Sequence, residues 1–211
     1  MKVVAFNGSP KKEGNTYHAL KMVGEELEKN GIDFEIIHVG NKNIRGCMAC
    51  GQCAKNKNEK CAINTDQVNE WIQFIKEADG ILLGSPVHFS GMSSTMKAFL
   101  DRAFYVHSTN DGLFRHKVGA SVVSVRRSGG SATFDSLNHY LTYAEMFMPT
   151  TNYWNVIHGT APGEVLEDEE GMQIMRVLGK NMAFLMKALE ATKESIPSPK
   201  GEEKIFTCFV R

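Results

Sequence analysis

Along the chain, short continuous runs of apolar residues alternate with longer stretches in which apolar residues recur every three or four positions. The short runs fit strands that are buried on both faces of a sheet, and the longer stretches fit amphipathic helices. Strands are predicted over residues 3–6, 34–39, 81–84, 118–125 and 152–157. Helices are predicted around the periodic positions within residues 20–27, 68–75, 96–104, 134–144 and 172–193.

Strict alternation of five strands with five helices is typical of crossover units around a parallel sheet. The pattern predicts an α/β fold, a flavodoxin-like three-layer α/β/α sandwich whose five-stranded parallel sheet has the order 2-1-3-4-5. The length of 211 residues suits one domain. We expect this domain to cover residues 1–195, with a cysteine-rich insertion at residues 46–62 and a C-terminal tail over residues 196–211.

The charge balance disfavours several kinds of partner. Lys and Arg total 24 and Asp and Glu total 24, so no net field attracts nucleic acid or anionic lipid. The N-terminus enters the first strand without a signal-peptide pattern, and no apolar run approaches the roughly 18 residues of a membrane span. We therefore expect a cytoplasmic protein with no nucleic-acid or membrane partner.

The loop after the first strand has the composition of a phosphate-binding loop. It runs from Gly8 to Thr16 and opens a helix whose unpaired N–H groups and dipole suit an anion. Ser9, Asn15 and Thr16 add side-chain donors. Because the loop lacks both the G-x-G-x-x-G and the G-K-[ST] spacings, a monophosphate fits better than NAD or ATP. The alternative is an ordinary strand-to-helix turn.

Two further loops follow buried strands. Residues 84–91 form an apolar, aromatic loop bounded by Pro and Gly, which suits contact with a flat ring. In residues 125–130, the glycines allow close backbone approach, and the arginines suit a ring carbonyl or a second phosphate. His88 and Arg126 are equally compatible with ordinary loop and surface roles. Ligands of open parallel sheets bind at the carboxyl ends of the strands, where both loops are expected.

Three motifs resemble the NADPH-dependent FMN reductase and flavodoxin-like family: Gly8-Ser9-Pro10 with Gly14-Asn15-Thr16, Gly84-Ser85-Pro86-Val87, and Lys-Ala-Phe-Leu-Asp-Arg at residues 97–102. The resemblance implies an FMN phosphate site formed by Ser9, Lys11, Asn15 and Thr16. It implies contacts with the isoalloxazine ring from Pro86, Val87, His88, Phe89, Ser90, Gly91, Arg126, Ser128, Gly129 and Gly130. His88 stands where the family has a Tyr.

Four cysteines lie within fifteen residues, at Cys47, Cys50, Cys53 and Cys61. Four thiolates in a compact loop are the ligand set of a 4Fe-4S cluster, whereas structural zinc usually pairs two C-x2-C knuckles over a longer span. Thiols without metal, packed beside the flavin, are a third possibility. Residues 46–61 also resemble the iron-sulfur flavoproteins of anaerobes, which favours these four cysteines as metal ligands. The cysteine Cys208 is expected to be a bystander.

The resemblance implies an FMN-dependent oxidoreductase that takes electrons from NAD(P)H or a reduced ferredoxin-like donor. It would pass them to a small acceptor or through the iron-sulfur cluster. Because flavin carries the electron chemistry, no acid-base dyad is required, and none is evident. The alternatives are a non-enzymatic flavodoxin-like carrier between protein partners, which the zero net charge disfavours, and a metal-stabilised sensing module. A homodimer or homotetramer is expected.

Overall fold

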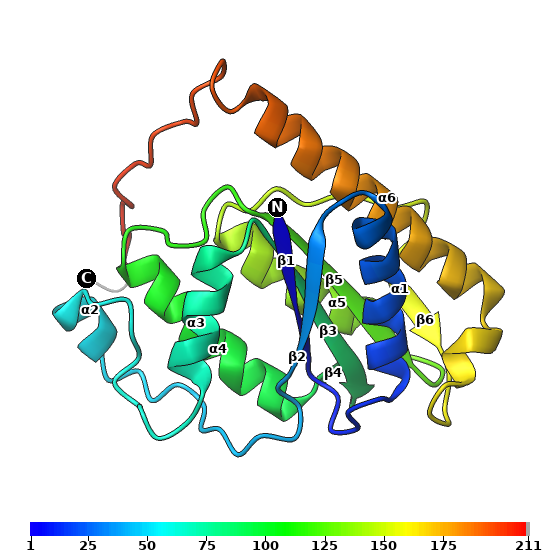
Figure 1. Cartoon of the computed structure of the whole chain (residues 1–211). Coiled ribbons are helices and arrows are strands. Elements are labelled where there is room, and N and C mark those ends of the chain that lie inside the picture. The colour runs from blue at the N-terminus through cyan, green and yellow to red at the C-terminus, as the bar shows by residue number, and fades with distance from the viewer. Residues whose placement is uncertain (210–211) are drawn as a thin grey trace.

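The computed structural model describes residues 1–209, and within them the expected sheet is present with helices on both faces (Figure 1). The sheet has the order β2-β1-β3-β5-β6, and the short strand β4 pairs with β3 off this path. Every pairing along the main path is parallel, while β3 and β4 are antiparallel. The strands are β1 (Lys2–Asn7), β2 (Asp33–His38), β3 (Gly80–His88), β4 (Gly91–Met92), β5 (Val118–Val125) and β6 (Val156–His158). The predicted order 2-1-3-4-5 is confirmed, with β4 as an addition.

The helices form the two outer layers. They are α1 (Asn15–Lys29), α2 (Gln52–Asn56), α3 (Val68–Glu77), α4 (Ser94–Thr109), α5 (Gly130–Tyr143), the 3-10 helix η1 (Glu164–Glu167) and α6 (Glu169–Thr192). Alternate residues of β1 serve the two layers: Val3 and Ala5 pack with residues of α1 and α6, while Val4 and Phe6 pack with residues of α3, α4 and α5. This alternation follows from the two-residue period of a strand.

An apolar core fills the space between the sheet and each layer of helices. On one face the rings of Phe6 and Trp71 both contact Phe99, with centroids 4.8 and 5.3 Å away. On the other face Gly24 lets α1 approach β2, because a Cβ there would lie 2.2 Å from the Phe34 ring. None of the helices in residues 1–209 has the length and apolar character needed to cross a membrane.

The structure corrects three local expectations. Residues 84–91 were predicted as a loop, but strand β3 extends to His88, and its end forms a hairpin with β4 in which Val87 pairs with Met92 and His88 with Gly91. The last strand is only Val156–His158, and the buried Asn155 before it bonds to β5 both through its carbonyl, which accepts from Val123 N at 2.9 Å, and through its side chain, from Nδ2 to the Ser121 carbonyl at 2.9 Å. The polar run of residues 55–60 predicts a loop, but helix α2 occupies residues 52–56 and so includes the first two of them.

Candidate functional site

An open cleft of about 220 Å³ lies at the carboxyl ends of the strands. It collects residues that follow β1, end β3, end or follow β5, and follow β6, as expected for an open parallel sheet. The lining residues are Ser9, Pro10, Lys11, Gly14, Asn15, Thr16, Pro86, Val87, His88, Ser124, Arg126, Gly159, Thr160 and Pro162. Eight residues predicted from sequence therefore meet in one place: Ser9, Lys11, Asn15, Thr16, Pro86, Val87, His88 and Arg126.

The first loop is folded by the buried side chain of Asn7. Asn7 Oδ1 accepts a hydrogen bond from Ser9 N at 3.0 Å, and Asn7 Nδ2 donates to the Lys12 carbonyl at 3.0 Å. Ser9 Oγ then accepts from Lys11 N at 3.2 Å. On the outer side, a His38 ring nitrogen lies 2.7 Å from the Ser9 carbonyl. These contacts hold the loop in one shape before any ligand binds.

The N-terminus of α1 points its backbone donors into this cleft. The first N–H groups of a helix have no partner within the helix, and the N-cap residue Gly14 offers no side-chain cap. Thr16 Oγ1 lies 2.6 Å from Ser124 Oγ, and Asn15 Oδ1 accepts from Gly163 N at 2.9 Å. The first turn has no acidic residue, so the helix dipole favours an anion here.

The charge of the cleft has one sign. Among its lining residues Lys11 and Arg126 are cationic, and none is Asp or Glu. Uncapped N–H groups, hydroxyls and two cations form a donor set that suits a phosphate ester. An acidic group at the α1 N-terminus would have opposed such a ligand.

The hairpin of β3 and β4 packs against the loop after β5. Phe89 and Ser90 form its turn with φ angles of 49° and 60°, which is the left-handed geometry of a type I′ turn. Gly129 has a φ of 87°, and a Cβ there would lie 2.9 Å from Ser90 Cα and 3.0 Å from Val87 Cγ1. Phe89 is fully exposed at the tip.

The remaining predicted ring residues do not line the cleft: Phe89, Ser90, Gly91, Ser128, Gly129 and Gly130. Gly91 instead faces a second opening of about 360 Å³ together with Met92, Lys97, Ser136, His139 and Tyr140. There Tyr140 is held by Asp101 and Lys97, and burial with the Asp101 hydrogen bond raises the pKa of Tyr140 to about 12. The two openings therefore lie on residues of the same hairpin.

Sequence reasoning missed several residues of the site. Asn7 follows the strand predicted over residues 3–6 and was given no role, and Ser124 was placed inside the strand predicted over residues 118–125. The others are Pro10, Gly14, Gly159, Thr160 and Pro162. A signal existed for the last three, because they follow a strand and the rule on carboxyl ends applies to β6 as it does to β1.

The four clustered cysteines line one small pocket of about 10 Å³ against α4. Cys53 is buried, Cys61 is partly buried, and Cys47 and Cys50 are exposed. The remaining lining residues are Met48, Gly51, Ala62, Ile63, Arg102, Tyr105 and Val106. Within residues 1–209, no three His, Cys, Asp or Glu side chains are arranged as a metal-binding group. The thiols thus share a pocket but do not have the geometry of a formed metal centre.

The backbone around these cysteines turns sharply. Four residues adopt positive φ within a short span: Ala49 at 50°, Gly51 at 69°, Lys57 at 49° and Glu59 at 59°. Only Gly adopts this region without cost, so three of the four positions carry local strain. Such strain persists where surrounding contacts impose it.

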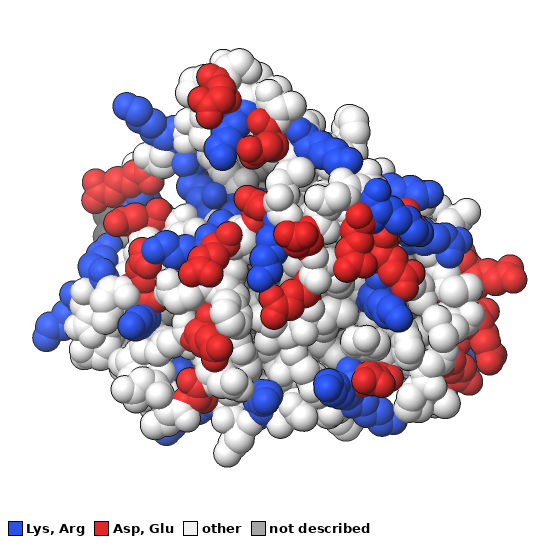
Figure 2. All heavy atoms as spheres, viewed as in Figure 1, with Lys and Arg blue, Asp and Glu red and all other residues white. Residues whose placement is uncertain are grey.

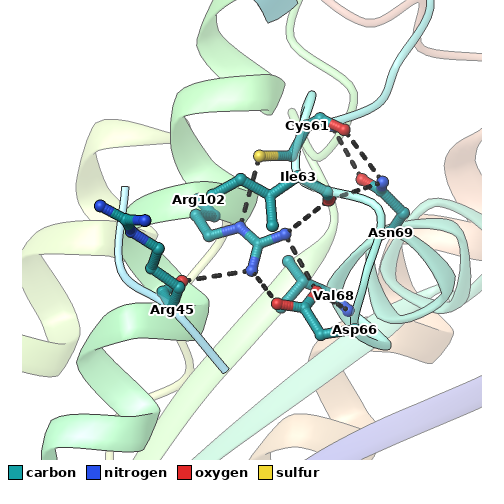
Figure 3. Close-up of polar contacts among 7 residues, drawn as sticks. All are labelled: Arg45, Cys61, Ile63, Asp66, Val68, Asn69 and Arg102. Atoms are coloured by element: carbon teal, nitrogen blue, oxygen red, sulfur yellow. Dashed lines mark hydrogen bonds and ion pairs between the residues drawn. The ribbon is translucent and has the colours of Figure 1, made fainter. Parts of the chain in front are cut away.

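Arg102 of α4 binds residues on both sides of the four cysteines (Figure 3). Its side chain is fully buried and forms an ion pair with Asp66, at 2.5 Å between Nη1 and Oδ2. Its Nε donates to Cys61 Sγ at 3.3 Å. Burial opposes the charge, but the hydrogen bonds to Asp66 and Cys61 outweigh it and raise the pKa of Arg102. Asn69 completes the network, since its Oδ1 accepts from Cys61 N and its Nδ2 donates to the Cys61 and Ile63 carbonyls.

Comparison with known proteins agrees with this geometry. The family model of NADPH-dependent FMN reductase matches residues 1–161. The chain is 34% identical over 197 residues to an iron-sulfur flavoprotein of Methanocaldococcus jannaschii, covering 90% of this chain and all of that protein. It is 31% identical to one of Archaeoglobus fulgidus, covering 83% and 86%.

Among solved structures, the fold is similar to RosB with bound 8-demethyl-8-formylriboflavin-5'-phosphate, with a TM-score of 0.69, 17% identity and coverage of 100% and 94%. It is also similar to a flavodoxin from the domain Archaea, with a TM-score of 0.57, 17% identity and coverage of 89% and 99%. The chain belongs to the NADPH-dependent FMN reductase family, and the iron-sulfur flavoproteins are among its relatives.

Proposed function

We propose that this protein is an FMN-dependent oxidoreductase that moves electrons from NAD(P)H, or from a reduced ferredoxin-like donor, to a small acceptor. In this proposal the cysteine pocket holds a 4Fe-4S cluster as a second electron site. The observation that carries the proposal is the convergence of four strand ends on one cleft that has two cations and no acidic lining residue. Family membership supports the choice of FMN.

The residues of the cleft fit FMN in two parts. The phosphate would bind at the α1 N-terminus, with Ser9, Lys11, Asn15 and Thr16 as donors. The ring would lie along Pro86, Val87 and His88, and Arg126 would contact the ring or a second anionic group. FMN supplies the hydride and electron transfer chemistry when it is bound. The chain's own residues would bind the phosphate and orient the ring.

The residues of the cysteine pocket fit a 4Fe-4S cluster by their chemistry. Four thiols face one pocket whose other side chains are mostly apolar, and two N–H groups already point at sulfur. These are Arg102 Nε to Cys61 and Ala49 N to Cys47, at 3.3 and 3.4 Å. Hydrogen bonds to the sulfurs are a usual feature of such clusters. The curated relatives named iron-sulfur flavoproteins support this assignment over zinc or thiols without metal.

A non-enzymatic carrier is the second candidate. Carrier flavodoxins rely on a strongly charged surface to steer toward protein partners. Figure 2 shows acidic and basic side chains interspersed on one face with no large area of one sign, in line with the zero net charge. This surface favours the oxidoreductase.

Anaerobic purification followed by FMN, iron, sulfide and zinc analysis tests the cofactors. We expect bound FMN and about four irons per chain. FMN without iron would reject the cluster, and absence of FMN after titration would reject the flavin site. Steady-state oxidation of NADH and NADPH with a quinone or free flavin acceptor then separates the enzyme from the carrier. The enzyme would reduce the small acceptor repeatedly with NADH, NADPH or reduced ferredoxin as the donor. A carrier would accept electrons from reduced ferredoxin but would not turn over the small acceptor with any of these donors.

The predicted homodimer or homotetramer is also kept as a proposal. The exposed rings of Tyr153 and Trp154, with centroids 4.3 Å apart, support a subunit contact next to β6. Light scattering on the purified protein measures the oligomeric state, and a monomer at micromolar concentration would reject the proposal.

A further inference from the structure

Arg102 uses every hydrogen-bond donor that it has. A guanidinium carries five N–H groups, one on Nε and two on each terminal nitrogen. Five acceptors lie within reach: Cys61 Sγ at 3.3 Å from Nε, the Arg45 carbonyl at 3.2 Å and Asp66 Oδ2 at 2.5 Å from Nη1, and the Ile63 carbonyl at 2.8 Å and Asp66 Oδ1 at 3.0 Å from Nη2. Figure 3 shows these contacts radiating from one buried side chain.

Those acceptors lie on both sides of the cysteine segment. Arg45 precedes Cys47, while Ile63 and Asp66 follow Cys61, so one side chain of α4 ties the two ends of the segment together. Lysine has only three donors on a single nitrogen and cannot replace this planar fork. Because burying an unpaired charge is costly, Asp66 is needed to neutralise the guanidinium.

We propose that Arg102 is a positioning residue that raises the reduction potential of the cluster in the cysteine pocket by donating its Nε hydrogen bond to Cys61 Sγ. This inference rests on the proposed 4Fe-4S cluster. Reduction adds one electron to the cluster and therefore increases its negative charge. A cation 3.3 Å from one ligand sulfur stabilises the reduced state more than the oxidised state.

Asp66 has the opposite effect and lowers the reduction potential of the cluster. Its carboxylate lies behind the guanidinium and cancels part of the positive charge that the sulfur experiences. No bond is formed or broken in the redox step. The electron comes from reduced flavin in the protein, or from dithionite in a titration. The potential thus depends on the balance between Arg102 and Asp66.

Two substitutions separate this role from simple support of the loop. In Arg102→Gln the cation is lost, so the cluster potential shifts downward, by at least about tenfold in the reduction equilibrium, or about 59 mV for one electron. In Asp66→Asn the cation is retained without its counter-charge, so the potential shifts upward. The amide Oδ1 of Asn keeps the hydrogen bond that Asp66 accepts from Val68 N. A loop that is merely loosened would shift both variants in the same direction.

The measurement is an anaerobic redox titration of the iron-loaded proteins, followed by visible absorbance and electron paramagnetic resonance. Opposite shifts support the inference, while unchanged potentials or shifts of one sign overturn it. If Arg102→Gln does not retain iron, Arg102→Lys keeps the charge and loses the Nε contact, and an unchanged potential in this variant overturns the inference. Wild-type protein without iron would instead refute the proposed cluster, which the metal analysis shows separately.

Discussion

The cleft at the strand ends and the cysteine pocket are held in shape by different parts of the chain. In the cleft, the buried Asn7 side chain folds the first loop, and the backbone makes most of the other shaping contacts: the N–H groups that open α1, the hairpin of β3 and β4, and the close approach of Gly129 to Ser90. In the cysteine pocket, side chains do this work: Arg102 donates to the Arg45 and Ile63 carbonyls on either side of the thiols, and Asn69 binds the backbone of Cys61 and Ile63. Thus the first site depends on fold and the second on a few side chains.

This difference predicts how each region responds to mutation. A site shaped by backbone contacts tolerates truncation of side chains but is sensitive to an added Cβ. A site held by side chains tolerates an added Cβ but is sensitive to truncation of those side chains. It also indicates that the pocket can lose its metal while the cleft keeps its flavin. The four predictions below test that separation, beginning with the largest expected effect.

Substitution of Cys53 by Ala should remove the cluster completely and leave the FMN content unchanged. Cys53 is the buried member of the four thiols and does not line the cleft. Iron and flavin analysis of the anaerobically purified variant measures both effects. The matched control is Cys208→Ala, which should retain iron because Cys208 does not line the pocket. Loss of FMN together with iron would show that the two sites are coupled.

The sequence was sufficient for the main elements because apolar periodicity reports burial directly. Residues 81–84 and 118–125 were predicted as central strands since continuous apolar runs fit burial on both faces. The hairpin escaped because Pro86 argues against a strand and Phe89-Ser90 is not a usual type I′ turn pair. The strand nevertheless continues, with Pro86 paired to Ser124 of β5.

The roles of buried polar residues could not be predicted from the sequence either. Arg102 lies in a helix whose apolar positions were predicted, but periodicity does not reveal that a charged residue beside them is buried. Its partner Asp66 is 36 residues away, and only the packing of α4 against the cysteine segment brings them together. The role of Asn7 was missed for the same reason, because its hydrogen bonds to Ser9 and Lys12 are visible only in the folded loop.

Acid should destabilise the side of the protein that supports the cysteines. His107 of α4 is buried, and its Nδ1 accepts a hydrogen bond from Phe114 N at 2.9 Å. Burial lowers the pKa of His107 to about 4, whereas a histidine in the unfolded chain keeps its ordinary value of 6.5. The unfolded state therefore binds more protons between these values, so the free energy of unfolding falls as pH decreases, by up to about 3 kcal/mol.

Urea unfolding at pH values of about 7 and 5 measures this loss. His107→Gln should flatten the dependence, since it removes the titrating group. The exposed His139 is the matched control, and His139→Gln should leave the dependence as it is in the wild type. Asn110 at the end of α4 bonds to the Cys53 carbonyl at 3.5 Å, so iron should be released before FMN on acidification. A pH-independent stability would contradict the role of His107.

Addition of one methyl group at Gly129 should disturb the cleft. The φ of 87° and the contact with Ser90 Cα at 2.9 Å both oppose a Cβ. Gly129→Ala should therefore lower the free energy of unfolding by about 1–3 kcal/mol and weaken FMN binding. Gly31 has a similar φ of 77° with nothing within 4 Å, so Gly31→Ala isolates the cost of the backbone angle. Thermal unfolding and FMN titration compare the two variants. Equal effects of Gly129→Ala and Gly31→Ala on FMN affinity would show that the contact between Gly129 and Ser90 does not shape the cleft.

The smallest expected effect is a gain in stability at the hairpin turn. Phe89 and Ser90 are both held at positive φ, where Asn and Gly are favoured, so the double substitution to Asn-Gly should add about 1 kcal/mol and raise the melting temperature by about 2–4 °C. Phe89 is fully exposed, so its removal costs no core packing. Because it is one of the predicted ring contacts, FMN affinity should fall as stability rises. Ser90→Gly alone is the control: it should give part of the gain in stability and lower FMN affinity less than the double substitution, because it retains the Phe89 ring. If the double variant binds FMN as tightly as the wild type, the Phe89 ring has no role in FMN binding.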